Sequence, residues 1–112
     1  RRRSAEDEDA EVPLGLYLQT ASPREILARM LRNLKEIHRA QEDWGRLVPV
    51  LDRLIVLQPD AWPEYRDRGL AHAALGHKQQ AVPDLEAYLH HTDAGQDIDA
   101  ITDRVAELKR KV

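Results

Sequence analysis

The 112-residue chain partly repeats its own sequence after a shift of 34 positions, and this period restricts the fold more than any other feature. Val48-Pro49 falls on Val82-Pro83, and Leu51 falls on Leu85. Three further identities, at positions 32/66, 38/72 and 40/74, bring the total to six. A period of 34 residues is typical of repeats made of two antiparallel helices, which stack on their neighbours around a continuous core. The chain is therefore predicted to be an all-α helical repeat.

The first helix is predicted over residues 23–40. Ser22 can cap its N-terminus, Pro23 suits the first helical position, and Glu25 completes a capping box. Apolar residues then recur at spacings of three and four, as on one face of an amphipathic helix. We expect this face to point into the core, and its members are Ile26, Leu27, Met30, Leu31, Leu34 and Ile37.

Four more helices are expected, joined by short loops that make neighbours antiparallel. The second follows its cap Asp43 and ends before Gln58, and the third follows its cap Asp60. Gly76 is expected to end the third helix in the left-handed conformation. The fourth covers about residues 78–91. The fifth carries the apolar residues Ile98, Ile101, Val105 and Leu108.

The second copy of the repeat resembles the tetratricopeptide (TPR) pattern. Tyr65 occupies the aromatic position, and Gly69 stands where the two helices of a repeat approach most closely. Lys35 replaces that glycine in the first copy, so we expect the first helix pair to be slightly spread. The predicted fold is thus two TPR-like helix-turn-helix repeats followed by a capping helix, an α-solenoid fragment of about five antiparallel helices.

The predicted organisation has two parts. Residues 1–21 form a linker or tail, because their first half is charged and lacks large apolar side chains. Residues 22–112 form the repeat domain, with repeats at about 28–61 and 62–95 and the capping helix at about 97–110. A short segment of the tail is expected to dock on the first helix, because apolar residues alternate there: Leu14, Leu16 and Leu18.

Residues 17–108 also resemble a known family. The runs SPREILARMLRNLKEIH, DWGRLVPVLDRLIVLQPDA, YRDRGLAHAALG and AVPDLEAYL look like the C-terminal TPR region of the bacterial SirB-type proteins. The most specific runs are RMLRNLK at Arg29–Lys35 and RDRG at Arg66–Gly69. In that family the region follows a transglutaminase-like domain, and its role is regulatory or accessory. The resemblance implies that any catalytic core lies upstream of this chain, which fits the absence of an initiating Met.

Composition argues against several classes of function. The chain has no Cys, which removes disulfides, thiolate metal sites and a cysteine nucleophile. Its net charge of -3 argues against nucleic-acid binding. No apolar run approaches the roughly 18 residues of a membrane span, so the predicted location is the cytoplasm. Ser22 is needed as a cap and no glycine-rich phosphate loop is present, so we predict no catalytic residues and no cofactor.

The five histidines do not suggest a metal site. His38 and His72 are repeat equivalents at a packing position, where partly buried structural histidines are expected. His90 and His91 are neighbours at a helix end, where they point to different faces and suit the helix dipole. No pair has the spacing of four that places two ligands on one helical face.

The charge of the first helix suggests a binding surface. Residues 23–39 carry five basic and two acidic side chains, an excess of +3 in an acidic protein. The first helix of each TPR lines the inner face, and arginines there can bind carboxylates through two hydrogen bonds. The predicted ligand is an acidic or extended peptide. The predicted peptide-binding residues are Arg29, Arg32, Glu36, Arg39, Arg66 and Leu70.

Other uses of the arginine face stay open. It could pack on the upstream domain, in which case the chain positions a transglutaminase-like core. It could form internal salt bridges or stay solvated, or it could take the acidic tail residues Asp7, Glu8 and Asp9, in cis or in a weak homo-oligomer. The expected partner is a protein or peptide, and neither nucleic acid nor membrane. Nucleic-acid binding through the first helix is kept as a third hypothesis only for its local positive charge.

Overall fold

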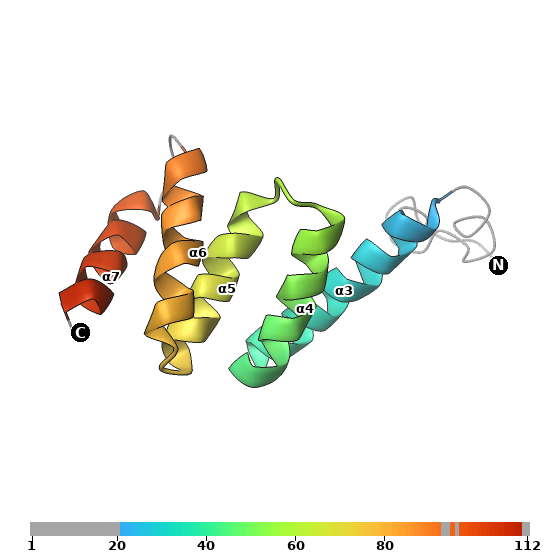
Figure 1. The fold of residues 1–112 in the computed structure, drawn as a ribbon. Helices are drawn as coiled ribbons and strands as arrows, with labels where there is room; N and C mark the ends of the chain where they lie inside the picture. The colour runs from blue at the N-terminus through green and yellow to red at the C-terminus, as the bar shows by residue number, and fades with distance from the viewer. Residues whose placement is uncertain (1–20, 93–94, 96, 111–112) are drawn as a thin grey trace, which may run out of the picture.

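The computed structural model describes residues 21–92, 95 and 97–110, and these residues contain helices but no strand. The helices are α3 (Pro23–Ala40), α4 (Trp44–Leu57), α5 (Trp62–Ala74), α6 (Lys78–His91) and α7 (Ile98–Arg110). They stack side by side in chain order, with α3 at one end and α7 at the other (Figure 1). The predicted all-α architecture is confirmed. The acidic tail and the predicted docking segment around Leu16 lie outside the described residues.

The helix ends agree with the sequence in all but one case. Ser22 Oγ accepts a hydrogen bond from the Glu25 amide at 3.1 Å, and the Glu25 carboxylate accepts one from the Ser22 amide at 2.9 Å. This is the predicted capping box. Asp43 caps α4 as expected, and Gly76 has a φ of 80° beyond the end of α5. The cap of α5 was predicted wrongly.

The N-cap of α5 is Ala61, and no side chain caps this helix end. Asp60 instead lies in the turn before the helix, where its carbonyl oxygen accepts a hydrogen bond from the Trp62 amide at 2.9 Å. Pro63 stands at one of the first two helical positions, where its missing N–H is tolerated. The helix can therefore begin without a side-chain cap.

The core consists of two apolar clusters. One lies among α3, α4 and α5 and contains Ala28, Leu31, Leu47, Val50, Leu51, Leu54 and Ala71. The other joins α6 to α7 and contains Ala81, Leu85, Tyr88, Ile101, Val105 and Leu108. The apolar face of α7 is thus buried against α6, which is the role expected of a capping helix.

Gly69 permits the close packing of α5 on α6. A Cβ atom at this position would lie 2.8 Å from the Leu85 side chain and 3.1 Å from the Ala81 carbonyl oxygen. Both neighbours are fully buried. The equivalent position in the first repeat is Lys35, and α3 packs less extensively on α4 than α5 does on α6. Gly69 therefore lies at the close approach of the two helices, as predicted.

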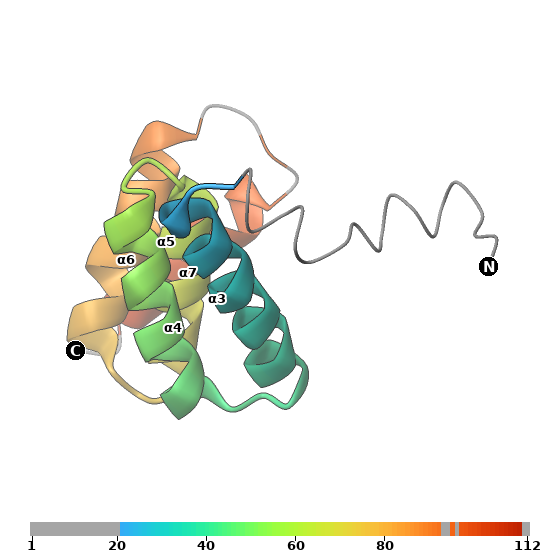
Figure 2. The same cartoon turned by 90° about the vertical axis from the view of Figure 1, so that its right-hand side faces the viewer.

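The prediction that the whole apolar face of α3 points into the core was wrong. Leu31 is buried, but Leu27, Met30, Leu34 and Ile37 are 44%, 58%, 42% and 50% exposed. The reason is the position of α3 at the end of the stack, where, among the described helices, only α4 and α5 share its buried cluster (Figure 2). In the described part of the chain, no helix is both long and apolar enough to cross a membrane.

Candidate functional site

An ion-pair network joins α3 to α5 across the face formed by the first helix of each pair. The Lys35 ammonium lies 2.6 Å from Glu64 Oε1 and 2.7 Å from Asp67 Oδ2. All three side chains are nearly buried, with exposed fractions of 13%, 11% and 14%. Two carboxylates therefore compensate one cation in a partly dry environment, where ion pairs are less screened than on an open surface.

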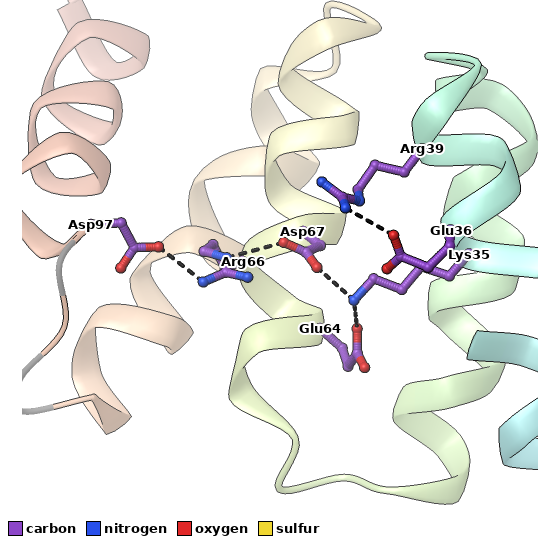
Figure 3. Close-up of polar contacts among 7 residues, drawn as sticks. All are labelled: Lys35, Glu36, Arg39, Glu64, Arg66, Asp67 and Asp97. Atoms are coloured by element: carbon purple, nitrogen blue, oxygen red, sulfur yellow. Dashed lines mark hydrogen bonds and ion pairs between the residues drawn. The ribbon is translucent and has the colours of Figure 1, made fainter. Parts of the chain in front are cut away.

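The network continues from α5 to the start of α7. Arg66 Nε donates to Asp67 Oδ1 at 3.0 Å, and Arg66 NH1 donates to Asp97 Oδ2 at 2.9 Å. The Tyr88 hydroxyl on α6 donates to Asp97 Oδ1 at 2.6 Å. Figure 3 shows the charges alternating in sign from α3 to residue 97. We call this set the charge ladder; its members are Lys35, Glu64, Asp67, Arg66 and Asp97.

The contacts of the charge ladder change the pKa values of its members. Burial favours the neutral form of Lys35, but hydrogen bonds to Asp67 and Glu64 outweigh burial and raise its pKa. The hydrogen bond from Tyr88, helped by Arg66, lowers the pKa of Asp97. The same hydrogen bond, together with burial, raises the pKa of the Tyr88 hydroxyl. At neutral pH these shifts therefore favour the charged forms of Lys35 and Asp97 and the neutral form of Tyr88.

The structure separates the predicted peptide-binding residues into two groups. Arg66 belongs to the charge ladder, and its side chain is 28% exposed. The others are more open: Leu70 is 37% exposed, and the remaining residues lie on the exposed surface of α3. These α3 residues are Arg29, Arg32, Glu36 and Arg39. The peptide-binding role of all six stays a prediction.

Arg39 and Glu36 lie beside the charge ladder, at its α3 edge (Figure 3). Arg39 NH2 donates to Glu36 Oε1 at 2.8 Å, and the two side chains are 58% and 60% exposed. An exposed pair three residues apart on one helix contributes little to stability. A ligand carboxylate could therefore replace Glu36 as the partner of Arg39 at low cost.

A second ion-pair cluster, which the sequence analysis missed, joins α4, α5 and α6. Arg68 makes two hydrogen bonds to Asp84, from Nε at 2.8 Å and from NH2 at 2.7 Å. Its NH1 donates to Asp52 at 2.9 Å. These residues are far apart in the chain, and no local pattern connects them. The RDRG run that contains Arg68 was noticed only as part of a family resemblance.

The five histidines differ in burial, and His77, His90 and His91 are exposed. His38 and His72 are partly buried, as predicted. The Nδ1 atoms of His72 and His77 lie 3.4 Å apart, and burial lowers the pKa of His72. His91 stacks on Trp62 with ring centroids 3.6 Å apart. Among the described residues, no group of three or more His, Cys, Asp or Glu side chains is arranged to hold a metal ion.

The architecture and the comparisons with known proteins agree on the class of protein. Helix pairs of 34-residue period, closed by a capping helix, define a helical-repeat protein. Residues 34–106 match a family model described as a tetratricopeptide repeat. The chain belongs to the tetratricopeptide repeat family.

Two curated relatives are named UPF0162 protein, and both come from Xylella fastidiosa. The protein of strain Temecula1 is 34% identical over 98 residues, which make up 88% of this chain and 35% of the relative. The protein of strain 9a5c is 34% identical over an alignment of 105 residues, and the match covers 90% of this chain and 37% of the relative. The chain therefore spans about a third of the length of the relatives it matches. No solved structure matches the chain.

Proposed function

We propose that this chain is a non-catalytic protein-interaction module, and that the cationic side of α3 binds an acidic or extended segment of a partner. TPR modules generally mediate contacts between proteins, and their ligands lie against the first helix of each repeat. The proposed contact residues on α3 are Arg29, Arg32 and Arg39, with Glu36 as the group that the ligand displaces. Leu70 on α5 offers apolar contact beside them.

The observation that carries the proposal is the difference between two sets of cations on this face. Lys35 and Arg66 already contact two carboxylates each, and their side chains are at most 28% exposed. Arg39 is 58% exposed, and the carboxylate that it contacts directly among the described residues is the equally exposed Glu36. The positive charge that a ligand can reach therefore lies on α3, whereas the charge of Arg66 is compensated within the fold. We accordingly assign Arg66 a supporting role.

A binding assay with a defined probe tests this proposal. The probe is a fluorescent peptide of alternating Glu and Leu, and a Gln-Leu peptide of the same length is the neutral control. We expect the acidic peptide to bind more tightly, with an affinity that falls as salt rises because exposed charges are screened. The Arg32→Glu/Arg39→Glu variant should bind about ten-fold or more weakly, since charge-assisted hydrogen bonds are lost and like charges introduced.

The matched control is Arg53→Glu, which makes the same change of charge on α4. Arg53 lies on the exposed surface of α4, and among the described residues its side chain donates only to the Pro49 carbonyl oxygen of its own helix, at 3.2 Å. Its reversal should leave peptide binding nearly unchanged. If Arg53→Glu weakens binding as much as the double variant, the attraction is a general effect of net charge. The α3 site would then be rejected.

A second candidate function is supported by the length of the relatives. Because the chain spans about a third of them, the same arginine face could pack on another domain of a longer polypeptide and position it. The resemblance to SirB-type proteins suggests a transglutaminase-like domain for that role. The two functions differ in the expected result of one experiment. If the face packs in cis, the full-length polypeptide should bind the acidic probe much more weakly than residues 1–112.

A further inference from the structure

A line of exposed apolar side chains runs along α3, on a different side of the helix from the arginines. We call it the α3 stripe, and its members are Leu27, Met30, Leu34 and Ile37, between 42% and 58% exposed. Their spacings of three, four and three residues place them on one helical face. This regular spacing is the pattern of a packing seam, and it distinguishes the stripe from scattered surface leucines.

The stripe belongs to α3, which lies at one end of the helical stack (Figures 1 and 2), and its four side chains are exposed among the described elements. At the other end, α7 buries its own apolar face against α6 through Ile101, Val105 and Leu108. Terminal repeats of a solenoid need such a cover, because a single repeat cannot bury its apolar surface alone. The two ends of this stack therefore differ: one is capped within the described residues and the other presents an apolar face.

The surroundings of the stripe indicate the chemistry of what covers it. At 100° per residue, Asn33 and Ala40 border the stripe on one side, and His38 and Leu31 border it on the other, so no Lys, Arg, Asp or Glu of α3 stands directly beside it. By the same geometry Arg32 and Arg39 lie on the opposite side of the helix. An acidic ligand would find no Lys or Arg of α3 directly beside the stripe. The geometry instead favours an uncharged apolar element, such as a helix or an extended segment with its own apolar edge.

The size of the stripe favours an occupant within the same polypeptide. From their exposed fractions, the four side chains together expose about as much surface as two whole side chains. A specific complex between free partners buries roughly 800 Å² on each side, which is well beyond this surface. A tethered partner can use a smaller surface, because its effective concentration reaches the millimolar range. The curated relatives contain such additional chain, since about two thirds of their length lies outside the match.

We propose that the α3 stripe is an intramolecular docking surface. In the longer polypeptide, an uncharged apolar element outside residues 1–112 packs along Leu27, Met30, Leu34 and Ile37. It caps the open end of the stack, as α7 caps the other end. This contact fixes the orientation of the repeat relative to the rest of the protein. It does not depend on the peptide site, because it uses the other side of α3.

Thiol labelling can test this proposal directly, because the 112 residues contain no Cys. The probe variant is Leu34→Cys, and the matched control is Val56→Cys on α4, where Val56 is 74% exposed. Labelling by a maleimide is followed by the mass of the peptide that carries the new thiol, in residues 1–112 and in the full-length polypeptide. Leu34→Cys should react about ten-fold or more slowly in the full-length polypeptide, as expected for a site that is covered most of the time. Val56→Cys should react equally fast in both.

Three results would overturn the proposal. Equal labelling rates for Leu34→Cys in the two proteins would mean that no element outside residues 1–112 covers the stripe. A rate in residues 1–112 that falls as protein concentration rises would identify a second copy of the chain as the occupant. A rate in residues 1–112 that rises when residues 1–20 are removed would identify that segment as the occupant. None of these results affects the peptide site, which the arginine variants test separately.

Discussion

Arg68 on α5 forms a bidentate ion pair with Asp84 on α6, with Nε 2.8 Å from Oδ2 and NH2 2.7 Å from Oδ1. Both side chains are largely buried, with exposed fractions of 22% and 11%. Arg68 also reaches Asp52 on α4 at 2.9 Å, but Asp52 is 52% exposed. One guanidinium thus links the second helix of the first pair to both helices of the second pair.

This geometry predicts that the two acidic partners of Arg68 contribute very differently to stability. Asp84→Ala should lower the free energy of unfolding by about 2–4 kcal/mol, because it leaves a largely buried guanidinium without its main partner. Asp52→Ala should lower it by at most about 1 kcal/mol, as expected for an exposed ion pair. Urea unfolding followed by circular dichroism measures both. Equal losses in the two variants would show that the cluster is solvated and that its geometry is not maintained in solution.

The close approach of α5 and α6 leads to a second prediction. Gly69→Ala should destabilise the fold by about 1–3 kcal/mol, because the added methyl group would overlap the Leu85 side chain and force the helices apart. The control is Gly45→Ala in α4, where no atom outside the local backbone lies within 4 Å of the added Cβ. That variant should be stabilised by about 0.5–1 kcal/mol through helix propensity alone. Thermal melts of the pair test the prediction, and a stable Gly69→Ala protein would contradict the packing.

The features that could be predicted from sequence are those with local causes. The capping box of Ser22 and Glu25 involves residues three apart, and the helix that follows it was placed correctly at both ends. The positive φ of Gly76 also follows from one residue and its neighbours. The repeat is found by comparing the sequence with a copy of itself shifted by 34 positions. None of these inferences requires knowledge of which helices meet in space.

The features that could not be predicted depend on contacts between distant residues. Lys35 was identified only as a substitute for glycine, because its partner Glu64 lies 29 residues away. Arg66 was predicted to bind a peptide, which stays a prediction, but its hydrogen bond to Asp97, 31 residues away, was not foreseen. The amphipathic pattern of α3 likewise shows that an apolar face exists and not whether a neighbour covers it. Leu31 and Leu34 belong to the same pattern, yet only Leu31 is buried.

The hydrogen bond between Tyr88 and Asp97 makes a prediction about pH. The folded-state pKa of Asp97 lies below its ordinary value of 3.8, so ionised Asp97 stabilises the fold above about pH 4. That contribution is lost as the pH falls through the folded-state pKa. Tyr88→Phe removes the strongest cause of the shift, and the pKa of Asp97 should rise toward its ordinary value. Carboxyl-carbon NMR titration measures this change.

The control for this titration is Tyr65→Phe. The Tyr65 hydroxyl donates to the Pro59 carbonyl oxygen at 2.9 Å and not to a carboxylate, so its removal should leave the pKa of Asp97 unchanged. A rise of equal size in both variants would point to a general loosening of the fold. An unchanged pKa in Tyr88→Phe would mean that Arg66 alone lowers the pKa of Asp97.

The charge ladder makes the last prediction, which separates stability from binding on the same face. Lys35→Met keeps most of the aliphatic volume but removes the cation between Glu64 and Asp67. Two nearly buried carboxylates would then repel each other, and we expect a loss of about 2–4 kcal/mol in the free energy of unfolding at pH 7. The loss should shrink as the pH falls and the carboxylates become protonated.

The control is Arg39→Ala, which removes a cation from the exposed edge of the same face. It should leave stability at the wild-type level while weakening binding of the acidic peptide. If Lys35→Met weakens peptide binding but unfolds like the wild type, the ladder is part of the binding site and the division between supporting and ligand-binding cations is wrong.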